Sequence, residues 1–225
     1  MTRGMRALVT GGTGRVGTAI VRRLDSDGWT VFAAGRADGD VSRPGEARAL
    51  VERAVQELGG LDLLVNAAGE GFAPKPFEQL DEADWDAAFG ATAKGSFFVT
   101  QAAAPALRES GGAGCVVMIE DVAAYQPWPA FAAHSAAKAA QAMLTRVLAR
   151  ALAPEVRVCG VAPGPVAIER GQEERRAAET LLGRVGSPDD IAEAVAYLAG
   201  ASFVTGTTLV VDGGRSLKSG AAPDA

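Results

Sequence analysis

The sequence of 225 residues has one histidine and two cysteines, and it lacks any long hydrophobic run. Without an apolar stretch of about 18 residues, no segment is predicted to cross a membrane. The N-terminal stretch MTRGMRALVT lacks the apolar segment and small-residue cleavage site of a secretory signal. Cys115 and Cys159 lie inside apolar runs, which favours buried reduced thiols over a disulfide or a metal site. These absences predict a protein of the reducing cytoplasm.

Basic residues are not in excess either. Twenty-two Lys and Arg stand against 27 Asp and Glu, which gives a net charge of −5, and no basic block stands out. Neither nucleic acid nor an anionic membrane is therefore an expected partner. Hydrophobic residues make up 48% and charged residues 22%, as in an ordinary folded domain. The length suffices for one domain with a large core.

Short apolar runs alternate with helical patterns along the chain. The alternation predicts an α/β fold, a single doubly wound parallel sheet with helices on both faces. We expect one domain over residues 1–214 and a flexible C-terminal tail over 215–225. The predicted strands are 6–10, 29–34, 61–65, 114–119, 156–162 and 207–211, and the predicted helices are 15–27, 44–58, 81–109, 134–153 and 188–199.

The motif TGGTGRVG (10–17) follows the first predicted strand and opens the first predicted helix. Gly12, Gly14 and Gly17 give the pattern G-x-G-x-x-G, in which glycines permit a tight turn and close backbone approach. The helix N-terminus can then hold a pyrophosphate with its N–H groups. The alternative is an ordinary glycine turn. The position of the motif at the first strand–helix junction favours a dinucleotide site, although the motif does not identify a reaction.

Two arginines indicate which dinucleotide is bound. A carboxylate at the end of the second strand would accept a hydrogen bond from a ribose 2′-hydroxyl and repel a 2′-phosphate. Here that strand ends at Arg36, and no carboxylate precedes Asp38. Arg36 can pair with a 2′-phosphate, and Arg15 in the glycine loop can join it. Either arginine can also be a solvated surface residue. The pattern favours NADP(H) over NAD(H).

Further motifs follow in a fixed order: LDLLVNAAG (61–69), GCVVMIED (114–121), HSAAK (134–138), VAPGPV (161–166), RVGSPDDIAEAVAYL (184–198) and VVDGG (210–214). Together with TGGTGRVG they make the chain resemble the short-chain dehydrogenase/reductase family from Ala7 to Gly214. The resemblance implies a Rossmann fold with a seven-stranded parallel sheet, order 3-2-1-4-5-6-7, a nicotinamide cofactor, and a homodimer or homotetramer. The implied cofactor contacts are Gly11, Gly12, Thr13, Gly14, Arg15, Val16, Gly17, Arg36, Asp40, Val41, Asn66, Ala67, Ala68, Gly69, Lys138, Pro163, Gly164 and Val166.

The sequence departs from the family pattern at four places. Arg15 stands at the middle glycine of the family's common loop, and the stretch from Arg36 to Val41 is too short for the usual helix between strands two and three. Thr92 aligns with the asparagine that helps to carry a proton-relay water. His134 stands where the family has its catalytic tyrosine, four residues before Lys138.

The position of the family's catalytic serine, thirteen residues before His134, holds Asp121. Pteridine reductases of this family similarly have aspartate there and arginine in the glycine loop. The segments 72–76, 100–110 and 143–158 also resemble bacterial members of that group. The resemblance therefore implies a carbonyl, alcohol or pterin-like substrate.

Reduction of a carbonyl or imine needs a hydride on carbon and a proton on oxygen or nitrogen. Lys138 would favour a neutral His134, whereas an adjacent Asp121 would stabilise the imidazolium that donates the proton. Lys138 would then mainly hold the nicotinamide ribose. Tyr125 is an alternative proton donor. The expected pocket residues are Phe72, Tyr125, Trp128 and Phe131, and the expected lid is 167–183, whose charges can equally form a solvated helix face.

The sequence thus predicts an NADP(H)-dependent oxidoreductase for a small-molecule substrate, with Asp121, His134, Lys138 and Thr92 in the catalytic site. Two alternatives remain open. One is a catalytically silent member of the family that binds NADPH or acts as a partner subunit. The other is a non-redox enzyme that uses His134 for acid–base elimination or isomerisation.

Overall fold

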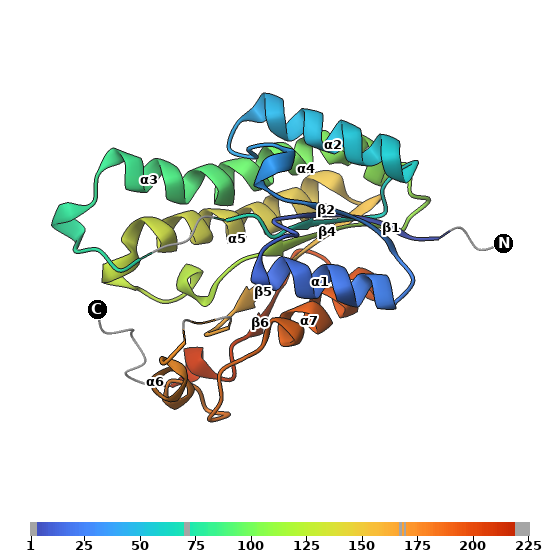
Figure 1. Ribbon diagram of the computed structural model, residues 1–225. Coiled ribbons are helices and arrows are strands. Elements are labelled where there is room, and N and C mark those ends of the chain that lie inside the picture. The colour runs from blue at the N-terminus through green and yellow to red at the C-terminus, as the bar shows by residue number, and fades with distance from the viewer. Residues whose placement is uncertain (1–3, 70–72, 167, 169, 219–225) are drawn as a thin grey trace.

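A six-stranded parallel sheet forms the centre of the protein (Figure 1). The computed structural model describes residues 4–69, 73–166, 168 and 170–218. The strand order is β2-β1-β3-β4-β5-β6. The strands are β1 (Arg6–Thr10), β2 (Thr30–Ala34), β3 (Leu63–Asn66), β4 (Gly114–Ile119), β5 (Val156–Pro163) and β6 (Thr208–Val211). The predicted α/β class and all six strand positions are confirmed.

Helices cover both faces of the sheet (Figure 1). One face carries α2 (Pro44–Leu58), α4 (Ser96–Arg108) and α5 (Ala132–Leu152), and the other carries α1 (Arg15–Ser26) and α7 (Pro188–Gly200). A helix predicted over 81–109 consists of α3 (Glu82–Phe89), a π-helical segment (Gly90–Gly95) and α4 in succession. The short α6 (Glu173–Ala178) lies in the predicted lid.

The sheet has one strand fewer than the family resemblance implies, because the chain between β2 and α2 is too short. Neighbouring parallel strands need a crossover of about a dozen or more residues. Here β2 ends at Ala34, a single 3-10 turn spans Arg36–Asp38, and α2 begins at Pro44. The implied edge strand and the helix before it are therefore both missing, and the rest of the order is retained.

Two apolar clusters sandwich the sheet. Leu8 and Leu64 face the layer of α2 and α4, whereas Val9 and Val65 face that of α1 and α7. All four side chains are completely buried, as expected where successive side chains of a strand point to opposite faces and both faces are covered. This framework fixes the carboxyl ends of the strands, where ligands bind in open parallel sheets.

The structure also describes the two cysteines, the longest helices and the start of the predicted tail. Cys115 and Cys159 are buried free thiols, as predicted, and burial raises the pKa of Cys115 to about 12. No helix in the described part of the chain is long and apolar enough to cross a membrane. Arg215, the first residue of the predicted tail, lies in the 3-10 helix Arg215–Leu217 and is buried among polar partners.

Candidate cofactor cleft and active site

The glycine loop is packed so closely that two of its positions exclude a side chain. Gly11 has a φ of 66°, and a Cβ there would lie 2.6 Å from the carbonyl oxygen of Ala67. A Cβ on Gly17 would lie 2.0 Å from the carbonyl oxygen of Gly11. Gly14 is the N-cap of α1. Because the first-turn N–H groups of a helix have no partner within the helix, this end of α1 can bind a phosphate.

A cavity of about 230 Å³ opens beside the glycine loop. It is bounded by the loop, the end of β2, the turn before α2 and the residues after β3. Nine predicted cofactor residues line it: Gly11, Thr13, Gly14, Arg36, Asp40, Val41, Ala67, Ala68 and Gly69. Six lining residues were not predicted: Thr10, Ala34, Gly35, Gly39, Leu50 and Ala91. Most of these expose small side chains or backbone, a type of contact that carries little sequence signal.

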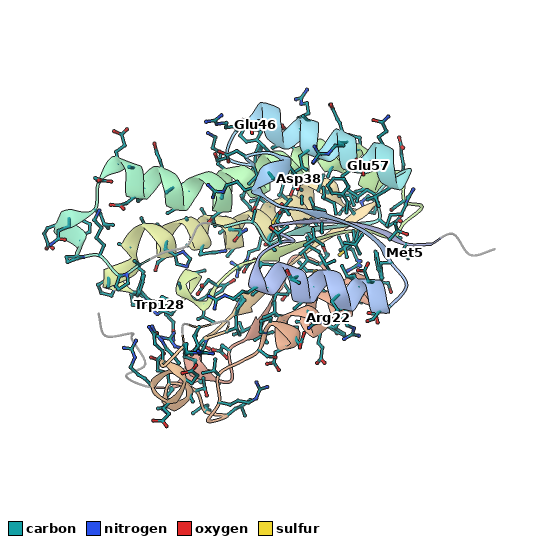
Figure 2. The ribbon with its side chains drawn as sticks, in the orientation of Figure 1. Met5, Arg22, Asp38, Glu46, Glu57 and Trp128 are labelled. Atoms are coloured by element: carbon teal, nitrogen blue, oxygen red, sulfur yellow. The ribbon has the colours of Figure 1, made fainter. Side chains whose placement is uncertain are left out.

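At the end of β2 a carboxylate lies near Arg36, the arginine predicted to pair with a 2′-phosphate. The sequence did not reveal this arrangement. Asp38 folds back so that its Oδ2 accepts a hydrogen bond of 2.9 Å from the backbone N–H of Gly35. Its Oδ1 pairs with Nη2 of Arg53 at 2.8 Å. Figure 2 shows Asp38 between the sheet and α2. Arg53 therefore compensates the negative charge of Asp38, while Arg36 is exposed at the cavity.

Asp40 and Val41 lie in the turn before α2 instead of on a strand. Oδ1 of Asp40 accepts from the N–H of Ser42, and hydrogen bonding with Ser42 lowers the pKa of Asp40. The N–H of Asp40 donates to Glu46, which lies on α2 near Asp38 (Figure 2). Both of these implied cofactor contacts thus line the cavity, although the edge strand that would carry them in the family is absent.

Among the described residues, several other predicted cofactor contacts are not part of the lining of this cavity. Asn66 is buried, and its Nδ2 donates to Oγ1 of Thr100 and to Met118. A Cβ on Gly164 would lie 2.6 Å from Cβ of Asp212, so Gly164 permits the close approach of β5 and the end of β6. Val166 lines a second cavity of about 350 Å³ near the lid.

His134 and Asp121 meet at the carboxyl end of β4. Asp121 follows β4, and its Oδ1 accepts from the N–H of Ala123, which starts a 3-10 helix. His134 lies in the first turn of α5, and its Nε2 is 3.3 Å from Oδ2 of Asp121. Both side chains are largely buried, with exposed fractions of 9% for His134 and 19% for Asp121. A buried imidazole beside a carboxylate can hold and release a proton.

Lys138 lies one helical turn after His134, and its ammonium is enclosed. Nζ donates to the carbonyl oxygen of Ile119 at 2.7 Å and to Oε1 of Gln141 at 3.0 Å. Nε2 of Gln141 donates in turn to Oγ of Ser96 on α4 at 2.8 Å. Burial lowers the pKa of Lys138, although the charge of Asp121 opposes this effect. Gln141 and Ser96 were missed by the sequence prediction, because an internal polar pair has no motif.

The hydroxyl of Tyr125 is bound by a different carboxylate, that of Glu120. The hydroxyl donates to Oε2 of Glu120 at 2.8 Å, and Glu120 also accepts from Thr145 at 2.6 Å and Thr208 at 3.0 Å. Partial burial raises the pKa of Tyr125, and the Glu120 carboxylate raises it further. Both effects make the phenol a weaker acid. Thr92 is buried in the π-helical segment between α3 and α4.

The predicted pocket residues and the lid are linked by Arg215. Trp128 makes an edge contact with Phe131, with ring centroids 5.9 Å apart, and Arg215 stacks on Trp128. Arg215 also pairs with Glu179 in the lid. The fourth predicted pocket residue, Phe72, and residues 167 and 169 of the lid are outside the described residues. Figure 2 shows Trp128 on the side of the molecule that carries α6.

Comparisons with known proteins agree with this architecture. The family model described as enoyl-(acyl carrier protein) reductase matches residues 18–216. The chain is 35% identical to 4-formylbenzenesulfonate dehydrogenase TsaC1/TsaC2 of Comamonas testosteroni, over 94% of this chain and 97% of that protein.

Two solved structures are similar along nearly the whole chain. A short-chain dehydrogenase/reductase from Serratia marcescens gives a TM-score of 0.86 at 30% identity, covering 95% of this chain and 98% of that one. The 3-ketoacyl-(acyl-carrier-protein) reductase from Brucella melitensis complexed with NADH gives 0.89 at 29% identity, covering 96% and 100%.

Proposed function

The chain belongs to the short-chain dehydrogenase/reductase family, and we propose that it is an NADP(H)-dependent oxidoreductase of a small carbonyl, alcohol or pterin-like substrate. In this proposal residues 1–214 form the catalytic domain, which works in the cytoplasm as a homodimer or homotetramer. Asp121, His134 and Lys138 form its catalytic site. When bound, the nicotinamide supplies or accepts the hydride, and the protein handles the proton.

The observation that carries the proposal is the Asp121–His134 pair beside Lys138. Nε2 of His134 lies 3.3 Å from Oδ2 of Asp121, at the strand end next to Ile119, whose carbonyl holds Lys138. In the reducing direction, His134 as imidazolium donates its proton to the substrate oxygen or nitrogen as the hydride reaches the neighbouring carbon. Asp121 stabilises the imidazolium before the transfer, and in oxidation the same pair accepts the proton.

Lys138 is proposed to hold the nicotinamide ribose. An ammonium has three N–H donors, and Ile119 and Gln141 accept two of them. Within the described part of the chain the third donor has no acceptor, and in this proposal it donates to a ribose hydroxyl. Tyr125 is the weaker candidate for the proton, because its hydroxyl already donates to Glu120 and its pKa is raised.

The preference for NADP(H) rests on charge at the end of β2. Arg36 lines the cavity and is exposed, and Arg15 stands exposed in the glycine loop, where its Nη1 donates to the carbonyl of Ile168 at 3.1 Å. A 2′-phosphate at the end of β2 would pair with the Arg36 guanidinium, and Arg15 adds positive charge at the glycine loop. Asp38 is neutralised by Arg53, so it opposes the phosphate less than an uncompensated carboxylate would.

Transfer of deuteride from stereospecifically labelled NADPH tests the proposal. We expect one face of the nicotinamide to deliver deuterium to at least one member of a panel of aldehydes, ketones and pterins. 4-Formylbenzenesulfonate belongs in that panel because a relative is named for it. Tight binding of NADPH without transfer to any substrate would overturn the oxidoreductase proposal and favour a nucleotide-binding protein without turnover.

A further inference from the structure

Two side chains that each carry a buried, unpartnered hydrogen-bond donor pack against each other between the lid and the loop after β4. Cζ of Arg215 lies 4.5 Å from the ring centroid of Trp128, and Arg215 is only 2% exposed. Within the described part of the chain, Nη2 of Arg215 and Nε1 of Trp128 are buried and have no hydrogen-bond partner. A buried donor without an acceptor is costly, and two on neighbouring side chains indicate a missing acceptor group.

The charge around this pair is positive. Nε of Arg215 is 2.9 Å from Oε2 of Glu179, but the same carboxylate also pairs with Nη1 of Arg176 at 2.9 Å. The remaining partner of Arg215 is neutral, because Nη1 donates to Oε1 of Gln126 at 3.1 Å. Two guanidinium groups therefore share one carboxylate, and a buried excess charge needs a counter-ion.

Asp212 is the other acidic residue next to this segment, and its oxygens are already used. Oδ1 accepts from the N–H of Gly214 at 2.8 Å, and Oδ2 accepts from the N–H of Ser216 at 2.6 Å. Asp212 thus shapes the turn that presents Arg215, and among the described residues no ion pair joins these two side chains. Among the described residues Arg215 therefore pairs with Glu179 alone, and its Nη2 remains a donor to which a ligand carboxylate can bind.

The pair also lies next to the proposed catalytic site along the chain and through ring contacts. Trp128 touches Phe131 edge to face, and Phe131 immediately precedes α5. His134 lies in the first turn of that helix. Trp128, Phe131 and His134 therefore lie along one loop–helix junction, which relates the Arg215–Trp128 pair to the proposed catalytic site.

We propose that Arg215 and Trp128 form an anion subsite, which binds the carboxylate of a substrate whose carbonyl is presented to His134. The inference rests on the proposed oxidoreductase function and adds a substrate class to it: small oxo acids or formyl acids. Nη2 of Arg215 and Nε1 of Trp128 each donate to a carboxylate oxygen, and Glu179 limits the strength of the site by competing for Arg215.

A matched substrate pair tests the subsite. The ratio of kcat/KM for 4-formylbenzoate to that for its methyl ester, measured with NADPH, compares an anion with a neutral molecule of similar shape. The wild type should favour the anion. Arg215→Leu should lower the ratio about tenfold or more, and Trp128→Phe, which removes only the indole N–H and some ring area, should lower it several-fold.

Glu179→Gln gives the distinguishing result. Removing the competing carboxylate should raise the ratio, whereas a purely structural role of the cluster predicts equal losses for both substrates. Arg175→Leu is the control, since Arg175 is exposed on α6 and changes the net charge by the same amount. A ratio that falls equally in Arg175→Leu and Arg215→Leu, or that stays constant in all variants, would overturn the subsite.

Binding is measured separately so that loss of turnover does not obscure the result. Calorimetric titration of the NADPH-loaded protein with benzoate and with benzamide should show tighter binding of benzoate, reduced in Trp128→Phe and increased in Glu179→Gln. If this pattern appears without deuteride transfer, the subsite holds and the oxidoreductase proposal fails. Equal affinities for benzoate and benzamide in all three proteins would reject the subsite, whatever the turnover.

Discussion

The cofactor cleft and the catalytic side of this protein are formed by different kinds of residues. The cleft consists of glycines, small side chains and backbone at the ends of β1, β2 and β3. On the catalytic side, charged side chains from different segments form pairs: Asp121 after β4 with His134 on α5, and Glu179 in the lid with Arg215 in the C-terminal segment. The first region works through shape, and the second works through the pairing of charges.

This difference decides how each region tolerates change. A glycine loop in van der Waals contact has no room to adapt, so a single added methyl group alters the binding surface. A network of charged side chains can exchange one residue for another when the geometry permits. A histidine at the position where the family resemblance implies a tyrosine belongs to this second kind of change.

The variant with the largest expected effect on activity lies on the catalytic side. His134→Gln removes the proton donor while keeping a polar side chain, so kcat should fall by about 10²- to 10⁴-fold. NADPH affinity, measured by fluorescence titration, should change little, because among the described residues His134 is absent from the lining of the cavity. An unchanged kcat would remove His134 from the mechanism.

The companion variant is His134→Tyr, which introduces the residue that the family resemblance implies at this position. If Asp121 and Lys138 leave room for a phenol, reductase activity should be retained or increased. If the His134→Gln and His134→Tyr variants both fold and bind NADPH but are inactive, the requirement lies with the imidazole itself.

The second test addresses the cleft. Gly17→Ala puts a Cβ 2.0 Å from the carbonyl oxygen of Gly11, which forces the glycine loop to move. We expect a loss of stability of about 1–3 kcal/mol and NADPH binding weakened by at least about tenfold. Gly45→Ala is the matched control, because Gly45 is also helical and a Cβ there meets nothing within 4 Å. Similar losses of stability and of NADPH affinity in both variants would show that the close packing of the glycine loop is not what the cleft depends on.

The strands, most helices and the glycine loop could be predicted because local sequence determines them. Apolar runs of strand length and the cap at Ser187 lie within a few neighbouring residues, and both were confirmed. The absence of the edge strand was not predicted. The shortness of the Arg36–Val41 stretch was visible, but the family resemblance still supplied seven strands.

Side-chain pairings between distant segments could not be predicted. Arg215 looked like the start of a polar tail, yet it is buried against Trp128 and Glu179, which lie far from it in sequence. The ion pair of Asp38 with Arg53 depends on the return of α2 over the end of β2. Such contacts depend on tertiary geometry and leave no local pattern.

The third test concerns the cofactor preference. Arg36→Leu should lower the ratio of NADPH to NADH affinity by about tenfold, because one charge-assisted contact to the 2′-phosphate is lost. Asp38→Asn should raise the same ratio by a smaller factor. Arg23→Leu, at the far end of α1, is a control for net charge. Equal affinities of the wild type for NADPH and NADH would contradict the proposed preference.

The smallest test concerns the junction between the lid and the rigid framework. Asp190 accepts hydrogen bonds from Ser187 and pairs with Arg184 at 2.8 Å, and these contacts hold its pKa well below the ordinary value. Asp190→Asn should lower the free energy of unfolding at pH 7 by about 1 kcal/mol, since Arg184 is more than half exposed and water screens the pair.

The pH dependence of that loss separates the ion pair from simple packing. A carboxylate with a lowered pKa in the folded protein contributes stability above the unfolded value, 3.8, and loses it as the pH falls. The difference between wild type and Asp190→Asn should therefore be constant near neutrality and shrink below about pH 4, as denaturant melts would show. A difference independent of pH would mean that Asp190 acts through shape, as the glycines of the cleft do, and the contrast between the two regions would not extend to the lid.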